Sequence, residues 1–144
     1  MSKKALIFGC SGQDGSFLAK SLIHDNYEVF GVSRYRKPDL RNHISLKIDK
    51  NVEFNSIDLS KINALSKLIE KVSPDEIYNL CGQSSVGKSF NEPLETYSSI
   101  VDISRNILES SRLLDYKGDL FFAGSGEIYG ETKQRASINS KVEP

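Results

Sequence analysis

The stretch KALIFGCSGQDGSFLAKSLIH, residues 4–24, decides the fold of this chain. It opens with the apolar run from Ala5 to Phe8, which is typical of a strand buried on both faces of a parallel sheet. Three glycines follow at G-x-x-G-x-x-G spacing, and a helical apolar pattern begins directly after them. A strand, a glycine turn and a helix start together form an anion site, because the first N–H groups of the helix are unpaired and point at the turn.

The three glycines have distinct expected roles. Gly9 lets the chain leave the strand sharply, Gly12 lets the backbone approach a pyrophosphate, and Gly15 lets the helix pack closely on the strand. The spacing is one residue longer than the commoner dinucleotide fingerprint, and an ordinary strand–helix turn is the alternative. The strand before the glycines and the helix after them favour dinucleotide binding.

Composition excludes several classes of function. The 144 residues suffice for one domain with a buried core, and the 19 Lys and Arg balance the 19 Asp and Glu. A net charge of zero argues against a partner that is nucleic acid or an anionic membrane. With no signal segment and no apolar run near 18 residues, we expect a cytoplasmic protein. The two cysteines, Cys10 and Cys81, cannot form a metal quartet, so we expect no metal site and two buried thiols.

Apolar periodicity predicts five strands that alternate with helices. The expected strands are 4–8, 27–33, 52–57, 76–80 and 119–123; the expected helices are 13–26, 61–72 and 93–115. Residues 36–51 and 81–90 read as loops, and His24 and His43 are expected at the surface. This alternation predicts an α/β fold, a Rossmann-type doubly wound parallel sheet with strand order 3-2-1-4-5 and helices on both faces.

The end of the second strand bears on the choice of cofactor. An NAD site places an acid there to hold the ribose 2′-hydroxyl, but this chain has Ser33 followed by Arg34, Tyr35, Arg36 and Lys37. Cations without an acid fit a 2′-phosphate and therefore NADP. A solvated loop with stray cations is the alternative.

Three further strand ends carry candidate residues. Asp58 follows the third strand and could accept a hydrogen bond from adenine or cap the next helix. The loop CGQSSVGKSF after the fourth strand is small and polar, as expected where a cofactor crosses the sheet. Ser125 and Glu127 follow the fifth strand and could act as hydrogen-bond donor and acid/base, although an exposed turn would look the same.

Three motifs, GCSGQDGSFLAKSL, IYNLCGQSSVGKSFNEP and FAGSGEIYG, resemble the extended short-chain dehydrogenase/reductase family of nucleotide-sugar enzymes. Within that family GQDGS and QSSVGKSF are most similar to GDP-mannose 4,6-dehydratases. The resemblance implies NADP contacts and a catalytic hydroxyl and carboxylate at Ser125 and Glu127. The implied cofactor contacts are Gly9, Ser11, Gly12, Gln13, Asp14, Arg34, Asp58, Leu59, Leu80, Gly82, Gln83 and Ser84.

The resemblance also implies a reaction on a nucleotide sugar. Hydride would leave C4 of the sugar for NADP, which acidifies the proton at C5. Glu127 would remove that proton and help expel the C6 hydroxyl as water, while Ser125 would hydrogen-bond the C4 oxygen. The hydride would then return to C6. An epimerase of the same family is the alternative.

The family's Tyr-x-x-x-Lys pair and its sugar-binding C-terminal part are expected to be missing from residues 1–144. The last residues resemble the stretch that precedes that pair in the family. We therefore expect the N-terminal part of such an enzyme, either a truncated piece or a shortened gene product. As it stands the chain would be a cofactor-binding module without turnover, and a homo-oligomer is possible for the full-length parent.

Overall fold

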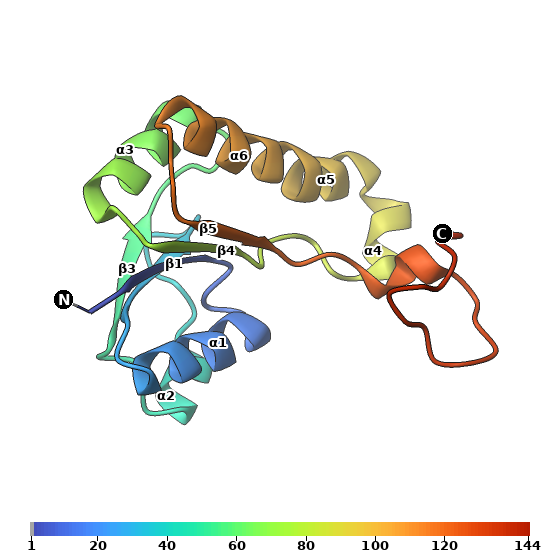
Figure 1. The fold of residues 1–144 in the computed structure, drawn as a ribbon, viewed down its shortest axis with the longest axis horizontal. Coiled ribbons are helices and arrows are strands. Elements are labelled where there is room, and N and C mark those ends of the chain that lie inside the picture. Colours follow the sequence, from blue (N-terminus) through green and yellow to red (C-terminus); the bar gives the residue numbers. More distant parts are fainter. Residues whose placement is uncertain (1) are drawn as a thin grey trace.

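The computed structural model describes residues 2–144 and contains one five-stranded parallel sheet (Figure 1). The strand order is β3-β2-β1-β4-β5. The strands are β1 (Lys4–Phe8), β2 (Glu28–Ser33), β3 (Val52–Ser56), β4 (Glu76–Asn79) and β5 (Asp119–Phe122). The predicted fold class and strand order are confirmed.

Helices cover both faces of this sheet, as predicted. The helices are α1 (Gln13–His24), α2 (Arg41–Ser45), α3 (Ile62–Val72), α4 (Val86–Asn91), α5 (Pro93–Tyr97) and α6 (Ile103–Leu113). In Figure 1 α1 and α2 lie on one side of the sheet, and α3, α5 and α6 lie on the other. A π-helical turn, Ser98–Asp102, joins α5 to α6, and a 3-10 turn, Gly126–Tyr129, follows β5. No helix within residues 2–144 has both the length and the apolar character that crossing a membrane requires.

The central strand β1 explains why the opening of the sequence is continuously apolar. Leu6 and Phe8 point into the core beneath α3 and α6, whereas Ala5 and Ile7 point into the core beneath α1. All four side chains are fully buried, because β1 pairs with β2 on one side and with β4 on the other. An alternating pattern would have placed polar groups in one of these two cores.

The helix α1 approaches β1 so closely that one position tolerates no side chain. A Cβ at Gly15 would lie 2.3 Å from the Gly9 carbonyl oxygen and 2.7 Å from the Cys10 Cα. Gly9 itself has φ +82°, which lets the chain turn out of the strand, and a Cβ there would meet the Leu80 backbone at 2.8 Å. The predicted roles of these two glycines are consistent with this geometry.

The structure corrects the expected loop at 36–51 and the expected exposure of His43. The short helix α2 lies in this segment, and the His43 side chain is fully buried. His43 Nε2 lies 3.6 Å from Cys10 Sγ, and the imidazole meets the Phe54 ring edge-on at a centroid distance of 5.1 Å. One turn of helix is too short for apolar periodicity to reveal, so the sequence signal was absent.

Burial of His43 lowers its pKa below the usual value, and the Asp49 carboxylate only partly opposes this effect. His24, in contrast, is exposed at the end of α1, as predicted. The first helix also stops at His24 rather than at Asn26, because Asn26 adopts a positive φ of 64°.

Gly15→Ala should destabilise the fold, because the new methyl group would press on the backbone of Gly9 and Cys10, directly after β1, rather than on a flexible side chain. We expect a loss of about 1–3 kcal/mol in the free energy of unfolding, measured by urea denaturation. Gly87→Ala is the matched control, since Gly87 is also helical but has open space around its Cα. That change should be neutral or slightly stabilising. An equal effect at both positions would contradict the close approach of α1 to β1.

The free energy of unfolding should also decrease as the pH is lowered, because of His43. Below about pH 6.5 the unfolded chain binds a proton at His43 that the folded chain resists, so the free energy of unfolding decreases as pH falls. His43→Phe should flatten this dependence in urea titrations between about pH 7.5 and 5. His24→Gln, which removes an exposed imidazole outside the core, is the comparison for loss of a histidine as such. A slope that is the same in the wild type and in His43→Phe would contradict a neutral buried His43.

Candidate functional site

The carboxyl ends of all five strands meet at one edge of the sheet. Phe8 at the end of β1 lies opposite Val32 in β2 and opposite Asn79 in β4, and Asn79 lies opposite Phe122 in β5. Every predicted site residue follows one of these strand ends. From β1 to β5 they are Gly9, Ser11, Gly12, Gln13 and Asp14; Arg34; Asp58 and Leu59; Leu80, Gly82, Gln83 and Ser84; and Ser125 and Glu127.

The glycine loop, residues 9–15, presents free backbone donors at this edge. The Gly12 N–H donates to the Gly9 carbonyl at 3.0 Å, and the Ser16 N–H donates to the Gly12 carbonyl at 3.0 Å. The N–H groups of Gln13 and Asp14 have no hydrogen-bond partner within residues 2–144, as expected at the start of α1. A Cβ at Gly12 would meet only the Gly9 oxygen, at 3.2 Å, so the outer side of the loop is open. This geometry fits a pyrophosphate.

The loop after β4 is held in place by its own polar side chains. The Gln83 amide nitrogen donates to the Ser85 carbonyl at 2.8 Å and to Thr96 Oγ1 at 3.3 Å, and the Gln83 backbone N–H donates to Ser99 Oγ at 3.2 Å. Gly82, with φ +152°, forms the turn beside it. In this structure the Gln83 side chain therefore fixes the loop on α5, and its expected contact with a cofactor stays a prediction.

Asn79 is a positioning residue that the sequence analysis missed. It is 2% exposed at the end of β4, where its Nδ2 donates to Ser104 Oγ at 3.1 Å. Its Oδ1 accepts hydrogen bonds from the Cys81 N–H at 3.3 Å and from the Cys81 thiol at 2.9 Å. Asn79 thus ties the loop after β4 to the long helical segment. The polar residue inside the run EIYNL was the available signal.

The two cysteines are free, but only Cys10 is fully buried. Cys81 is partly exposed, so the expectation of two buried thiols is confirmed for Cys10 alone. Burial raises the pKa of both thiols, to about 12 at Cys10 and about 11 at Cys81. Both side chains are therefore protonated and unreactive near neutral pH.

The segment after β2 leaves Arg34 exposed and without a carboxylate partner within residues 2–144. Its guanidinium lies 5.0 Å from the centre of the Tyr35 ring. The next acid in the chain, Asp39, is bound by the Arg41 guanidinium, whose hydrogen bonds lower the pKa of Asp39 to about 2. Asp39 is thus paired with Arg41, and no ion pair within residues 2–144 involves Arg34, which leaves its guanidinium available to an anionic ligand.

Asp58 follows β3, and the structure excludes one of the two roles expected for it. The residue that caps α3 is Lys61, so the helix-capping role is wrong. Asp58 Oδ1 instead accepts hydrogen bonds from the Ser60 hydroxyl at 2.7 Å and from its N–H at 3.0 Å, which lower the pKa of Asp58. Leu59 packs in the core, and its carbonyl accepts a hydrogen bond from Asn106 at 3.1 Å. Their contacts with adenine stay predictions.

The turn after β5 brings Ser125 and Glu127 together. Ser125 caps the 3-10 turn, and its Oγ accepts a hydrogen bond from the Glu127 N–H at 3.2 Å. Both residues are exposed, and no other side chain contacts them in residues 2–144 through a hydrogen bond or an ion pair. Their acid/base role stays a prediction.

The sequence does contain one Tyr-x-x-x-Lys spacing, at Tyr129 and Lys133, so the expectation of no such spacing is wrong. On an α-helix this spacing would place both side chains on one face. Here the 3-10 turn ends at Tyr129, and Gly130 follows with φ +60° and ψ −150°. The chain turns away between the two residues, so the structure does not place them on a shared helix face.

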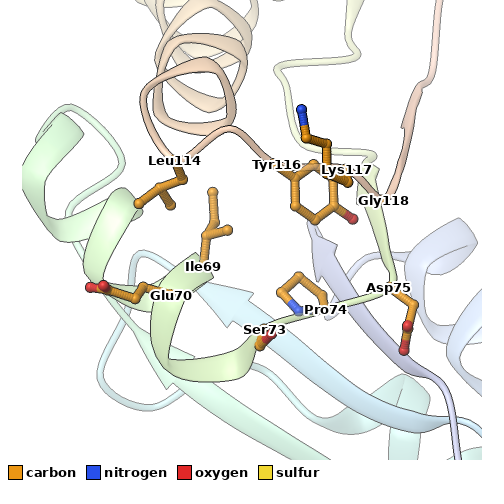
Figure 2. A pocket seen from close by; sticks show the side chains of 9 residues that line it. All are labelled: Ile69, Glu70, Ser73, Pro74, Asp75, Leu114, Tyr116, Lys117 and Gly118. Atoms are coloured by element: carbon orange, nitrogen blue, oxygen red, sulfur yellow. The ribbon is translucent and has the colours of Figure 1, made fainter.

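A shallow pocket lies at the opposite edge of the sheet, between the ends of α3 and α6 (Figure 2). Its lining includes Ser73, Pro74 and Asp75 before β4, and Tyr116, Lys117 and Gly118 before β5. These residues lie at the amino ends of the strands. None of the predicted site residues lines this pocket, and it is separate from the candidate site.

Comparison with known proteins identifies the family. The family described as GDP-mannose 4,6 dehydratase matches residues 6–143. The GDP-mannose 4,6-dehydratase of Vibrio cholerae is 37% identical, over 94% of this chain and 39% of that protein. The human GDP-mannose 4,6 dehydratase is 34% identical, over 90% of this chain and 37% of that protein. The chain thus spans about two fifths of the length of these relatives.

Solved structures agree with the fold. The UDP-Glc/GlcNAc 4-epimerase of Campylobacter jejuni superposes with a TM-score of 0.85 at 22% identity, covering 99% of this chain and 44% of that one. The UDP-glucose 4-epimerase of Thermus thermophilus in complex with NAD gives 0.83 at 23% identity, covering 98% and 44%. Identities this low establish the Rossmann-type fold only. The match over residues 6–143, together with the sequence identity to these relatives, shows that the chain belongs to the GDP-mannose 4,6-dehydratase family.

Proposed function

We propose that residues 1–144 form the NADP-binding N-terminal part of a nucleotide-sugar 4,6-dehydratase that acts on GDP-mannose. The observation that carries this proposal is the family match, which runs through the glycine loop and the turn at Ser125 and Glu127. Because the chain spans about two fifths of its relatives, the activity belongs to the longer protein.

The strand ends are suited to hold the cofactor. The open N–H groups at the start of α1 would bind the pyrophosphate, and Arg34 would bind the 2′-phosphate. Asp58 and Leu59 would contact adenine, and the loop after β4 would line the path across the sheet. The remaining contacts would come from Ser11, Asp14, Leu80, Gly82, Gln83 and Ser84.

The bound cofactor would supply reversible hydride transfer at the sugar. Glu127 would remove the C5 proton once C4 is oxidised, and would then assist loss of the C6 hydroxyl as water. Ser125 would donate a hydrogen bond to the C4 oxygen. The carboxylate favours a dehydratase over an epimerase of the same family, because epimerisation at C4 requires no elimination and no base at this position.

Further chain from the parent would cover the apolar surface beside β5. Phe121 and Phe122 are 53% and 48% exposed, and Phe122 shares a shallow groove with Val101 and Leu108 of the helical segment. Exposed apolar patches of this kind mark interfaces. We infer that the sugar-binding part packs here, and that any homo-oligomer would form in the full-length parent. We also infer that the protein is cytoplasmic, which the two unpaired thiols support.

The chain should bind NADP more tightly than NAD. A charge-assisted contact between Arg34 and the 2′-phosphate is worth about ten- to a hundredfold in affinity. Arg34→Ala should remove most of this preference in calorimetric titrations while leaving NAD affinity nearly unchanged. Arg36→Ala, in the same exposed loop, is the matched control and should retain most of the preference. Equal binding of both cofactors by the unmodified chain would contradict an NADP site.

A longer protein carrying these residues should convert GDP-mannose to a 4-keto-6-deoxy product. Residues 1–130 can be joined to the matching C-terminal part of the Vibrio cholerae relative and assayed by mass spectrometry. Glu127→Gln should retain cofactor binding and reduce product formation by about 100-fold or more. An active chimera that keeps its rate with Glu127→Gln would contradict the assigned base. A chimera that epimerises the sugar without loss of water would favour the alternative.

The isolated 144-residue chain should bind NADP without turning over GDP-mannose. Removal of members of a catalytic unit typically costs several orders of magnitude. The same product assay tests this, with Tyr129→Phe as the companion variant. Product formed by the unmodified chain and abolished by Tyr129→Phe would show that Tyr129 and Lys133 replace the family's pair, and would contradict a module without turnover.

A further inference from the structure

We propose that Asn42 and His43, on the short helix α2, are positioning residues that hold the glycine loop in its cofactor-binding conformation. This inference rests on the proposed function, because the loop is where the cofactor would bind. Neither residue belongs to the strand ends, and neither would touch the cofactor. They act through the two loop residues, Cys10 and Ser11, that they contact.

Two contacts join α2 to consecutive residues of the loop. The Asn42 Nδ2 donates a hydrogen bond to the Ser11 carbonyl at 3.2 Å. The His43 Nε2 lies 3.6 Å from the Cys10 Sγ, and both of these side chains are fully buried. The loop is therefore held at a backbone oxygen on its exposed side and at a side chain on its buried side.

The contact at Ser11 acts directly on the anion-binding end of the loop. The Ser11 carbonyl belongs to the same peptide group as the Gly12 N–H, which donates to the Gly9 carbonyl at 3.0 Å. Asn42 therefore fixes the plane of the peptide that precedes the free N–H groups of Gln13 and Asp14. A loop whose donors are fixed before binding loses less entropy when the ligand arrives.

The buried contact is built into the fold. Gly31 in β2 leaves room for it, since a Cβ there would lie 3.1 Å from the Cys10 Cβ and 2.7 Å from the Phe54 ring. The Phe54 ring in turn packs edge-on against His43. The sheet thus supports the imidazole from one side, while Cys10 lies at its Nε2.

The imidazole can hold this position only while it is neutral. The His43 Nδ1 is buried without a hydrogen-bond partner in residues 2–144, so a second ring proton would have no acceptor. The titratable or charged groups that face the ring are the Cys10 thiol, which burial keeps protonated, and the Asp49 carboxylate. Acidification should therefore favour release of α2 from the loop.

The test combines two measurements on the 144-residue chain. Calorimetry gives the Kd for NADP, and NMR hydrogen exchange gives the protection of the Gly12 amide without any cofactor. Asn42→Ala and His43→Phe should each weaken binding by about three- to tenfold and speed exchange at Gly12 by a similar factor. Exchange at Leu6, in the centre of β1, should not change.

Two further variants and a pH titration separate positioning from general stability. Asn63→Ala removes an exposed helical asparagine on α3, on the other face of the sheet, and should change neither measurement. His43→Gln can still donate toward Cys10 and should restore binding toward the wild-type value. The ratio of the Kd values of His43→Phe and the wild type should shrink as the pH falls through the lowered pKa of folded His43, because the wild type itself then loses the contact. Using a ratio cancels the titration of the ligand's own phosphate.

Different results would overturn the positioning role and the proposed cofactor site. Unchanged exchange at Gly12 and unchanged affinity in both Asn42→Ala and His43→Phe would overturn the positioning role. Absence of dinucleotide binding by the wild type would overturn the proposed cofactor site instead. Exchange at Gly12, which needs no ligand, would in that case still decide whether α2 holds the loop.

Discussion

The close approach of α1 to the end of β1 is the constraint on which the rest of this structure depends. There is no room for a Cβ at Gly15, because the Gly9 carbonyl and the Cys10 backbone occupy that space. The same approach aims the start of α1, with its unpaired N–H groups, across the carboxyl edge of the sheet. The tight packing contact and the unpaired N–H groups at the start of α1 are therefore two consequences of one local geometry.

The sheet extends this geometry to five strand ends. Because all neighbouring strands are parallel and nearly in register, each loop that leaves a carboxyl end starts at the same edge as the glycine loop. The chain needs no long-range side-chain contact to gather its candidate residues there. Buried polar groups such as Asn79 then fix the shape of individual loops, since an unpaired amide in that position would be costly.

The candidate residues at the strand ends differ in how they are held by the rest of the described chain. Ser125 and Glu127 lie in an exposed turn, and Phe121 and Phe122 of β5 remain about half exposed. The relatives of this family are longer than this chain, and the exposed side chains of β5 would be a suitable surface for further residues to cover.

The sequence by itself determined the elements whose signal is local or periodic. The run of residues 5–8, the glycine spacing and the strand–helix alternation predicted the fold class and the strand order, because alternating strands and helices favour a parallel sheet and a glycine turn after the first strand is typical of the Rossmann order. Arg34 and the turn at Ser125 and Glu127 could likewise be located, since each directly follows a strand.

Only the tertiary structure decided which polar groups are buried and what they hold. His43 reads as a loop residue, yet it is enclosed between Cys10 and Phe54, which are 33 and 11 residues from it in the chain. The spacing of Tyr129 and Lys133 reads as a helical pair until Gly130 turns the chain. Such contacts join segments distant in sequence or depend on single backbone angles, and neither leaves a periodic trace in the order of the residues.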